Sequence, residues 1–324
     1  MVLKTLNKIN NSYHEIVAVI THNDKPHGRK HDLLIETPLA TEARNLSLPV
    51  YKTDKMEPEL VAKLKSLNAD LFVVFAFGVI FREDFLKSTN FGGINIHPSL
   101  LPKYRGASPI QKAILDGVNK SGVTIQTVKL KVDSGDIILQ KQFDIADNDD
   151  IISVENKVSD IAANMILKAL KKYDFKFKKQ DESHASYCKL IKKEDGLINW
   201  NSDSVSINNK VRAFVKWPIA HSFIDNKKIN IYKSIPVNKF IVISEDLKMW
   251  HSENGFINIG ERISDNLKPG SLGLSNKHDG IIVKCGKGIL IIQELQIEGK
   301  KRLNWKEFIN GHLDINTKSF EPFI

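Results

Sequence analysis

The stretch Gly93-Ile94-Asn95-Ile96-His97-Pro98-Ser99-Leu100-Leu101-Pro102-Lys103-Tyr104-Arg105-Gly106-Ala107 decides how the first half of this chain folds. Its first residues form an apolar run that predicts a β-strand. Pro98 ends that strand, because proline has no N–H to donate to a ladder. Asn95 and His97 lie two positions apart, so their side chains point to the same face of the strand. The long segment that follows predicts an ordered loop, an element in which binding residues concentrate.

Patterns on both sides of this strand indicate an α/β domain. Residues 71–75 are apolar on both faces of a strand, which is typical of the interior of a parallel sheet covered by helices. The pattern predicts helices over residues 33–45, 57–67 and 151–170. Strands that alternate with helices favour a domain with a mainly parallel sheet over residues 1–175.

The character of the chain changes after residue 175. Residues 176–195 are highly charged and lack a long apolar stripe, which predicts a linker. Residues 196–324 carry many short β-branched runs separated by turn signals, a spacing that favours a small all-β barrel or sandwich. We expect helices there only at residues 206–214 and 305–310, and an added hairpin or extended strands within residues 234–268.

The composition is that of an ordinary globular protein, with 42% hydrophobic and 26% charged residues in 324. The longest apolar run, residues 71–81, has eleven residues, whereas a helix needs about 20 to cross a bilayer. The N-terminus has no apolar signal core, and Cys188 and Cys285 have no metal-binding spacing. We therefore expect a cytoplasmic protein without a disulfide framework or a metal site.

The net charge is +9, and it is denser near the C-terminus. Residues 1–200 carry 29 Lys and Arg against 25 Asp and Glu, while residues 201–324 carry 18 against 13. A basic C-terminal region fits a polyanionic partner such as nucleic acid. The charge fits equally well with a chain that is rich in Lys, Asn and Ile throughout, so charge alone leaves both interpretations open.

A carboxylate completes a chemical set with the strand residues. Asp133 follows His97 by 36 residues, in the turn Asp133-Ser134-Gly135-Asp136. When an amine attacks an acyl carbon, the developing oxyanion needs fixed donors, which the Asn95 amide and the His97 imidazole can supply. A carboxylate can hold the imidazolium or a water and relay the proton that the amine loses. Each residue alone is more simply structural, so the combination carries the prediction of an acyl-transfer site.

The chain closely resembles the 10-formyltetrahydrofolate-dependent formyltransferases. Their pattern Asn-x-His-(Pro/Gly)-Ser-Leu-Leu-Pro-x-(Tyr/Trp)-Arg-Gly-(Ala)-x-Pro stands at residues 95–109, and their Asp-x-Gly-Asp element at residues 133–136. The resemblance implies a Rossmann-like first domain, catalytic roles for Asn95, His97 and Asp133, and 10-formyltetrahydrofolate as co-substrate, with no metal. It implies folate contacts from Phe75, Ala76, Phe77, Gly78, Ile80, Ser99, Leu100, Leu101, Pro102 and Asp136.

Within the family, the resemblance is closest to members that formylate the α-amino group of methionyl initiator tRNA for translation initiation. Residues 21–30 resemble their mobile loop that approaches the acceptor end of the tRNA, although the residues after Arg29 depart from the usual Gly-Lys-Lys. Residues 196–324 are implied to be an OB-like domain whose basic face contacts tRNA, in a monomeric enzyme. The expected tRNA contacts are Lys25, Arg29, Lys30, Lys300, Lys301 and Arg302.

Two departures from the family pattern bear on this interpretation. Members begin with a strand and a Gly-Thr-Pro-x-Phe turn, whereas residues 1–8 already have the pattern of the first helix. Either the start codon is misassigned or the chain lacks a central strand. We expect the stability to be marginal, because unpaired buried backbone groups cost about 1–3 kcal/mol each. Residues 234–268 are also longer than the family usually carries. Two alternatives stay open: a sugar-nucleotide or small-amine N-formyltransferase, and a catalytically impaired RNA- or folate-binding remnant.

Overall fold

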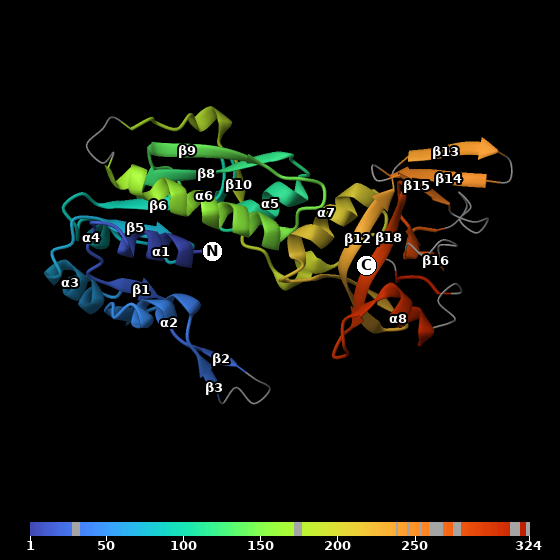
Figure 1. Cartoon of the computed structure of the whole chain (residues 1–324), viewed down its shortest axis with the longest axis horizontal. Helices are drawn as coiled ribbons and strands as arrows, with labels where there is room; N and C mark the ends of the chain where they lie inside the picture. The colour runs from blue at the N-terminus through green and yellow to red at the C-terminus, as the bar shows by residue number, and fades with distance from the viewer. Residues whose placement is uncertain are drawn as a thin grey trace. The chain divides into compact units, whose positions relative to one another are not determined.

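The structure is a computed structural model that describes residues 1–27, 33–171, 177–237, 239–244, 247–252, 255–258, 268–274, 280–311 and 318–321. The chain forms two compact units (Figure 1). The first comprises residues 1–109, 120–144 and 154–190, and the second comprises residues 110–119, 145–153 and 191–324. None of the helices in the described ranges is both long enough and apolar enough to span a membrane.

The first unit is organised around a four-stranded mixed sheet with the order β5-β6-β8-β9 (Figure 1). Its strands are β5 (Phe72–Phe75), β6 (Gly93–His97), β8 (Lys120–Thr127) and β9 (Ile137–Asp144). β5 and β6 are parallel, but β8 runs antiparallel to both β6 and β9. The predicted mainly parallel sheet is thus confirmed only in part. The short connection between β8 and β9 is a turn, and parallel neighbours would need a longer crossover.

Smaller strand pairs and helices surround this sheet. The pairs are β1 (Val19–Thr21) with β4 (Val50–Lys52), β2 (Lys25–His27) with β3 (Leu33–Ile35), and β7 (Arg105–Gly106) with β10 (Tyr187–Cys188). The helices of this unit are α1 (Leu3–Asn10), α2 (Pro38–Asn45), α3 (Pro58–Ser66), α4 (Glu83–Leu86), the larger part of α6 (Ile151–Lys171) and the 3₁₀ helix η1 (Glu182–His184), whereas α5 (Pro109–Leu115) belongs from residue 110 to the second unit. Among the described strands, none joins the β1–β4 pair to β5.

The helix predicted over residues 33–45 is wrong in its first part. Residues Leu33–Ile35 form strand β3, and α2 begins only at Pro38. The residue before a proline is pushed toward extended backbone, and Thr37 has a ψ of 146°. Its hydroxyl oxygen then caps the helix by accepting a hydrogen bond of 3.1 Å from the backbone N–H of Ala40. The helix therefore starts where the Thr-Pro pair allows it to start.

The second unit contains a six-stranded antiparallel sheet. Its strands are β11 (Ala220–Ile224), β12 (Lys227–Val237), β16 (Leu272–Leu274), β17 (Ile281–Lys284), β18 (Ile289–Ile297) and β19 (Leu303–Asn304). They run in the order β11-β12-β18-β17-β16, with β19 also beside β18. The helices α7 (Ser204–Phe214) and α8 (Trp305–Asn310) and the 3₁₀ helix η2 (Lys193–Gly196) complete the unit. The predicted β-rich architecture is confirmed.

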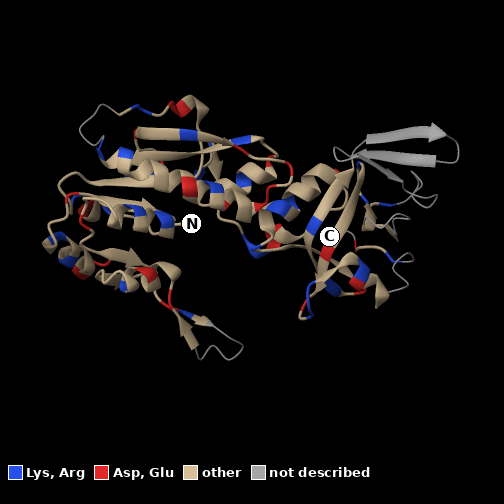
Figure 2. Ribbon diagram, viewed as in Figure 1, with Lys and Arg blue, Asp and Glu red and all other residues tan. Residues whose placement is uncertain are grey.

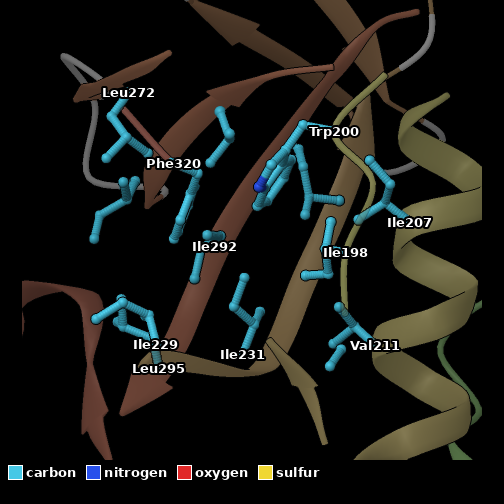
Figure 3. Packing of buried hydrophobic residues seen from close by; sticks show 14 of the residues in the cluster. Ile198, Trp200, Ile207, Val211, Ile229, Ile231, Leu272, Ile292, Leu295 and Phe320 are labelled. Carbon is cyan, nitrogen blue, oxygen red and sulfur yellow. The ribbon is translucent and has the colours of Figure 1, made fainter. Parts of the chain in front are cut away.

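The core of the second unit lies between this sheet and its helices. Buried Ile, Leu and Val side chains of the sheet gather around Trp200 (Figure 3). Trp200 stacks on Phe320, with ring centroids 4.7 Å apart. A separate three-stranded antiparallel sheet consists of β13 (Lys239–Ser244), β14 (Leu247–Ser252) and β15 (Gly255–Asn258). The hairpin predicted within residues 234–268 is confirmed by the β13–β14 pairing.

Candidate active site

The pairing of β6 with β8 brings polar side chains together on one face of the sheet. Asn95 of β6 lies opposite Gln126 of β8 in the strand register. Asn95 and His97 both reach the carboxylate of Asp133, which follows the end of β8. The expectation that Asn95 and His97 share a face is therefore confirmed, because one carboxylate contacts both. We call Asn95, His97, Gln126 and Asp133 the catalytic cluster, after the role that the sequence predicts for Asn95, His97 and Asp133.

Asp133 is the centre of the catalytic cluster. Its Oδ1 accepts hydrogen bonds of 3.0 Å from the Asn95 amide and 3.0 Å from the Gln126 amide. Its Oδ2 accepts one of 2.8 Å from the backbone N–H of Gly106, and His97 Nδ1 lies 3.5 Å from Oδ1. The carboxylate side chain is only 9% exposed. Three N–H donors on its two oxygens therefore fix the orientation of this carboxylate.

His97 is held between this carboxylate and a backbone carbonyl. Its Nε2–H donates a hydrogen bond of 2.8 Å to the carbonyl oxygen of Tyr104, so in the neutral ring Nδ1 faces Asp133 as an acceptor. Burial lowers the pKa of His97, and the Asp133 carboxylate and the Tyr104 carbonyl oppose that shift. The imidazole is thus a proton acceptor that is stabilised, once charged, by the carboxylate beside it.

The turn that carries Asp133 depends on close backbone packing. Asp133 has a φ of 50°, in the left-handed region that non-glycine residues rarely adopt. The turn closes on Thr127, whose N–H donates to the Asp136 carbonyl at 2.9 Å while its hydroxyl accepts from the Asp136 N–H at 2.9 Å. A Cβ at Gly135 would lie 1.6 Å from the Thr127 carbonyl oxygen. Only glycine fits there, so the predicted turn is real and tightly constrained.

Three residues near the site were missed from the sequence. Gln126 becomes visible only once the register of β6 and β8 is known. Arg105 is fully buried, and its guanidinium donates to Gln180 and Glu182 at 2.6–3.1 Å. Gln180 lies in the stretch predicted as a linker, and nothing in its local sequence marks it as part of a site. The motif that contains Arg105 offered the one usable signal.

Comparison with known proteins identifies the family. Residues 2–170 match the formyl transferase family model, and residues 190–313 match the model of the formyl transferase C-terminal domain. The chain belongs to the formyl transferase family.

Curated relatives extend over both matched regions. The methionyl-tRNA formyltransferase of Citrifermentans bemidjiense is 35% identical over 302 residues, which is 92% of this chain and 86% of that protein. The methionyl-tRNA formyltransferase of Borrelia hermsii is 35% identical over 320 residues, covering 98% of this chain and 96% of that protein. These formyl transferases are similar to this chain along nearly its whole length.

Solved structures share the fold. The N-formyltransferase of Helicobacter canadensis, in complex with folinic acid and dTDP-3-aminofucose, aligns with a TM-score of 0.57 at 25% identity, over 78% of this chain and 93% of that one. HypX of Aquifex aeolicus aligns with a TM-score of 0.59 at 18% identity, over 93% of this chain and 50% of that one. The second likeness shows the fold alone.

The residues predicted to contact folate in this formyl transferase lie in three places. Phe75 ends β5 next to Ile96 in the parallel register, so residues 75–80 leave the sheet at the edge where His97 ends β6. Ala76, Gly78 and Ile80 are exposed, Ile80 by 80%, and half-buried Phe77 stacks on Phe81. An exposed segment with an apolar side chain is thus available beside the catalytic cluster.

The loop after β6 supplies the second place. Ser99 and Leu101 are buried, and the Ser99 hydroxyl donates to the Lys103 carbonyl at 2.6 Å. Leu100 and Pro102 are half-buried. The third place is Asp136, whose carboxylate accepts a hydrogen bond of 2.9 Å from Lys129. In the part of the chain that the structure describes, no group of three or more His, Cys, Asp or Glu side chains could hold a metal ion.

The predicted tRNA contacts are found partly within the described ranges. Lys25 is exposed on β2, whereas Arg29 and Lys30 lie outside the described residues. Lys300 and Lys301 are exposed between β18 and β19. Arg302 stacks over the Tyr232 ring at 4.2 Å and pairs with Glu294. Figure 2 shows Lys and Arg dispersed among Asp and Glu over both units, so the basic charge is not confined to one element.

Proposed function

We propose that this chain transfers the formyl group of 10-formyltetrahydrofolate to the α-amino group of methionyl initiator tRNA. The observation that carries the proposal is the likeness, at 34–35% identity and over more than nine-tenths of this chain, to methionyl-tRNA formyltransferases. The assembled catalytic cluster supports it, because three N–H donors hold one buried carboxylate in place beside Asn95 and His97, which argues against an inactive remnant. We assign the reaction to the cytoplasm, where translation begins.

The chemistry follows from the contacts of the catalytic cluster. The amine nitrogen attacks the formyl carbon, a C–N bond forms, and the carbonyl oxygen becomes an oxyanion. The Asn95 amide has two N–H groups, one of which donates to Asp133, so the second can donate to the oxyanion. His97 or a water held by Asp133 takes the proton from the amine. When His97 takes the proton, the imidazolium that forms places a positive charge beside the oxyanion, and the Asp133 carboxylate stabilises that imidazolium.

Collapse of the tetrahedral intermediate completes the transfer. The bond between the formyl carbon and N10 of the folate breaks, and N10 receives the proton. The products are tetrahydrofolate and N-formylmethionyl-tRNA. We place the folate on residues 75–80, on the loop at residues 99–102 and on Asp136. The first two segments follow the ends of β5 and β6, and Asp136 lies in the turn that carries Asp133.

We assign residues 1–175 to the catalytic domain, 176–195 to the linker, and 196–324 to an OB-like domain that binds tRNA in a monomeric enzyme. The antiparallel sheet with its exposed Lys300 and Lys301 supports the assignment of tRNA binding to residues 196–324. Lys25, Arg29 and Lys30 are the further tRNA contacts. Cations of this kind fix the register on RNA through phosphates.

The test is formylation by the purified protein with 10-formyltetrahydrofolate and one of three acceptors. We expect N-formylmethionyl-tRNA with charged initiator tRNA, and no product with free methionine or with a dTDP-amino sugar. The sugar arm is included because the Helicobacter canadensis relative was solved with such a ligand. Formylation of the sugar but not of the tRNA would replace the proposal by the sugar-nucleotide alternative. Binding of tRNA without any turnover would favour the impaired remnant.

A further inference from the structure

A segment of the predicted linker crosses both loops that form the site. We call residues 178–188 the strap. At one end, Lys178 and Ile137 exchange backbone hydrogen bonds of 2.8 and 3.0 Å. At the other end, β10 pairs with β7, and the Arg105 N–H donates to the Ser186 carbonyl at 2.8 Å. The strap thus joins β9, which follows the Asp133 turn, to the loop that supplies the Gly106 N–H.

Gln180 is the strap residue that reaches the catalytic cluster. Its amide nitrogen lies 3.0 Å from Gln126 Oε1, 2.9 Å from the Asp133 carbonyl oxygen and 2.7 Å from the Gly135 carbonyl oxygen. Its amide oxygen accepts hydrogen bonds of 3.1 and 2.7 Å from the guanidinium of Arg105. One side chain therefore contacts β8, the Asp133 turn and the loop after β6.

The buried Arg105 fixes which way this amide points. Arg105 is fully buried, and besides Gln180 its guanidinium pairs with Glu182 of the strap. Because arginine has no acceptor atom, the amide oxygen of Gln180 must face it. The amide N–H₂ then necessarily faces the carbonyl oxygens of the turn and of Gln126.

From these contacts we propose that Gln180 is a positioning residue for the transfer reaction. It binds both the backbone of Asp133 and the side chain of Gln126, which itself donates to the Asp133 carboxylate. It holds Asp133 in its left-handed conformation and keeps Oδ1 directed at Asn95 and His97. Gln180 touches no reacting atom in this account. The inference rests on the catalytic role proposed for Asp133.

The decisive variant is Gln180→Glu. The new carboxylate keeps the partnership with Arg105 but presents an oxygen to three carbonyl oxygens, so it selectively breaks the link to the turn. We expect kcat to fall by roughly 10²-fold, the cost that a misplacement of about 1 Å can carry. Both KM values should change much less, because the substrates do not contact Gln180. Gln180→Met, which removes the amide without adding charge, should give a smaller fall in kcat.

The matched control is Asp181→Asn, the adjacent strap residue. Asp181 is 62% exposed and bonds only to Ser183 and His184 among the described residues. The kcat of the Asp181→Asn variant should therefore equal that of the unaltered protein. Thermal melts of all variants report folding. An unchanged kcat in folded Gln180→Glu, or a loss of activity that matches the loss of folded protein in both Gln180 variants, would overturn the inference. Asp133→Asn assayed alongside separates the two proposals: its full activity overturns the catalytic assignment itself.

Discussion

The catalytic cluster and the exposed turn at residues 298–302, which we call the basic turn, use charge in opposite ways. In the catalytic cluster, the side chains of His97 and Asp133 are 5% and 9% exposed, and both are held by hydrogen-bonding partners. In the basic turn, Lys300 and Lys301 are exposed, and neither has an acidic side-chain partner within the described ranges.

This difference sets how each region responds to change. Removing one partner from a buried polar cluster leaves the other group unsatisfied, at a cost of about 1–3 kcal/mol. It also moves the remaining groups out of the geometry that the transition state needs. An exposed cation interacts through water, and its removal is felt as a small decrease in a summed electrostatic attraction. We therefore expect a single substitution in the catalytic cluster to cause a large loss of kcat. We expect each substitution in the basic turn to cause a small loss of tRNA affinity, and these losses to add.

The largest effect is expected from Asp133→Asn. The asparagine amide would point its N–H₂ at a donor, either the Gly106 N–H or the amides of Asn95 and Gln126, and the charge that stabilises His97 would be lost. We expect kcat for formylation of methionyl-tRNA to fall by about 10²–10³-fold, as for other preorganised transition-state groups. Asp160→Asn, which removes an exposed ion pair with Lys4, is the control and should leave kcat unchanged. Similar kcat values for Asp133→Asn and Asp160→Asn would contradict the predicted difference between buried and exposed charges.

A somewhat smaller effect should follow from Gly135→Ala, which leaves every charge in place. The added Cβ would sit 1.6 Å from the Thr127 carbonyl oxygen, so the turn must shift and carry Asp133 with it. We expect roughly a 10²-fold fall in kcat, since a shift of about 1 Å is enough for that. Gly299→Ala is the counterpart in the basic turn. A Cβ there meets no atom within 4 Å, although the φ of 79° imposes some strain, so kcat should stay the same.

How much of this site could be predicted from the sequence depends on the range of the contacts. Asn95, His97 and Asp133 were found because strand periodicity and a local motif place them, and the β6 strand behaved as its pattern predicts. Gln126 and Gln180 were missed because their roles depend on register and on a contact between segments 45 or more residues apart. The helix predicted at residues 33–45 is too long because the apolar residues at its start fit a strand equally well, and the Thr-Pro pair prevents a helix from running through it.

The next effect concerns the pH dependence of stability. Because burial lowers the pKa of His97 below its ordinary value of 6.5, the unfolded chain takes up a proton more readily than the folded one. The contribution of His97 to the free energy of unfolding is present above pH 6.5 and is lost as the pH falls from there to the lowered pKa. Melting temperatures should therefore fall less steeply on acidification through this range for His97→Gln than for the unaltered protein. Parallel curves for the two proteins would contradict the prediction.

The smallest effect is expected in the basic turn, from the double variant Lys300→Ala and Lys301→Ala. If both ammonium groups bind tRNA phosphates, the slope of log Kd against log salt should decrease by about 0.7–0.9 for each ammonium–phosphate interaction that the substitutions remove. The kcat at saturating tRNA should not change, because neither lysine belongs to the catalytic cluster. Lys4→Ala provides a matched removal of charge on α1, and its salt slope should equal that of the unaltered protein. An unchanged slope in the double variant would show that the basic turn does not bind tRNA phosphates. A fall in kcat without a change in slope would show that the basic turn and the catalytic cluster are coupled rather than independent.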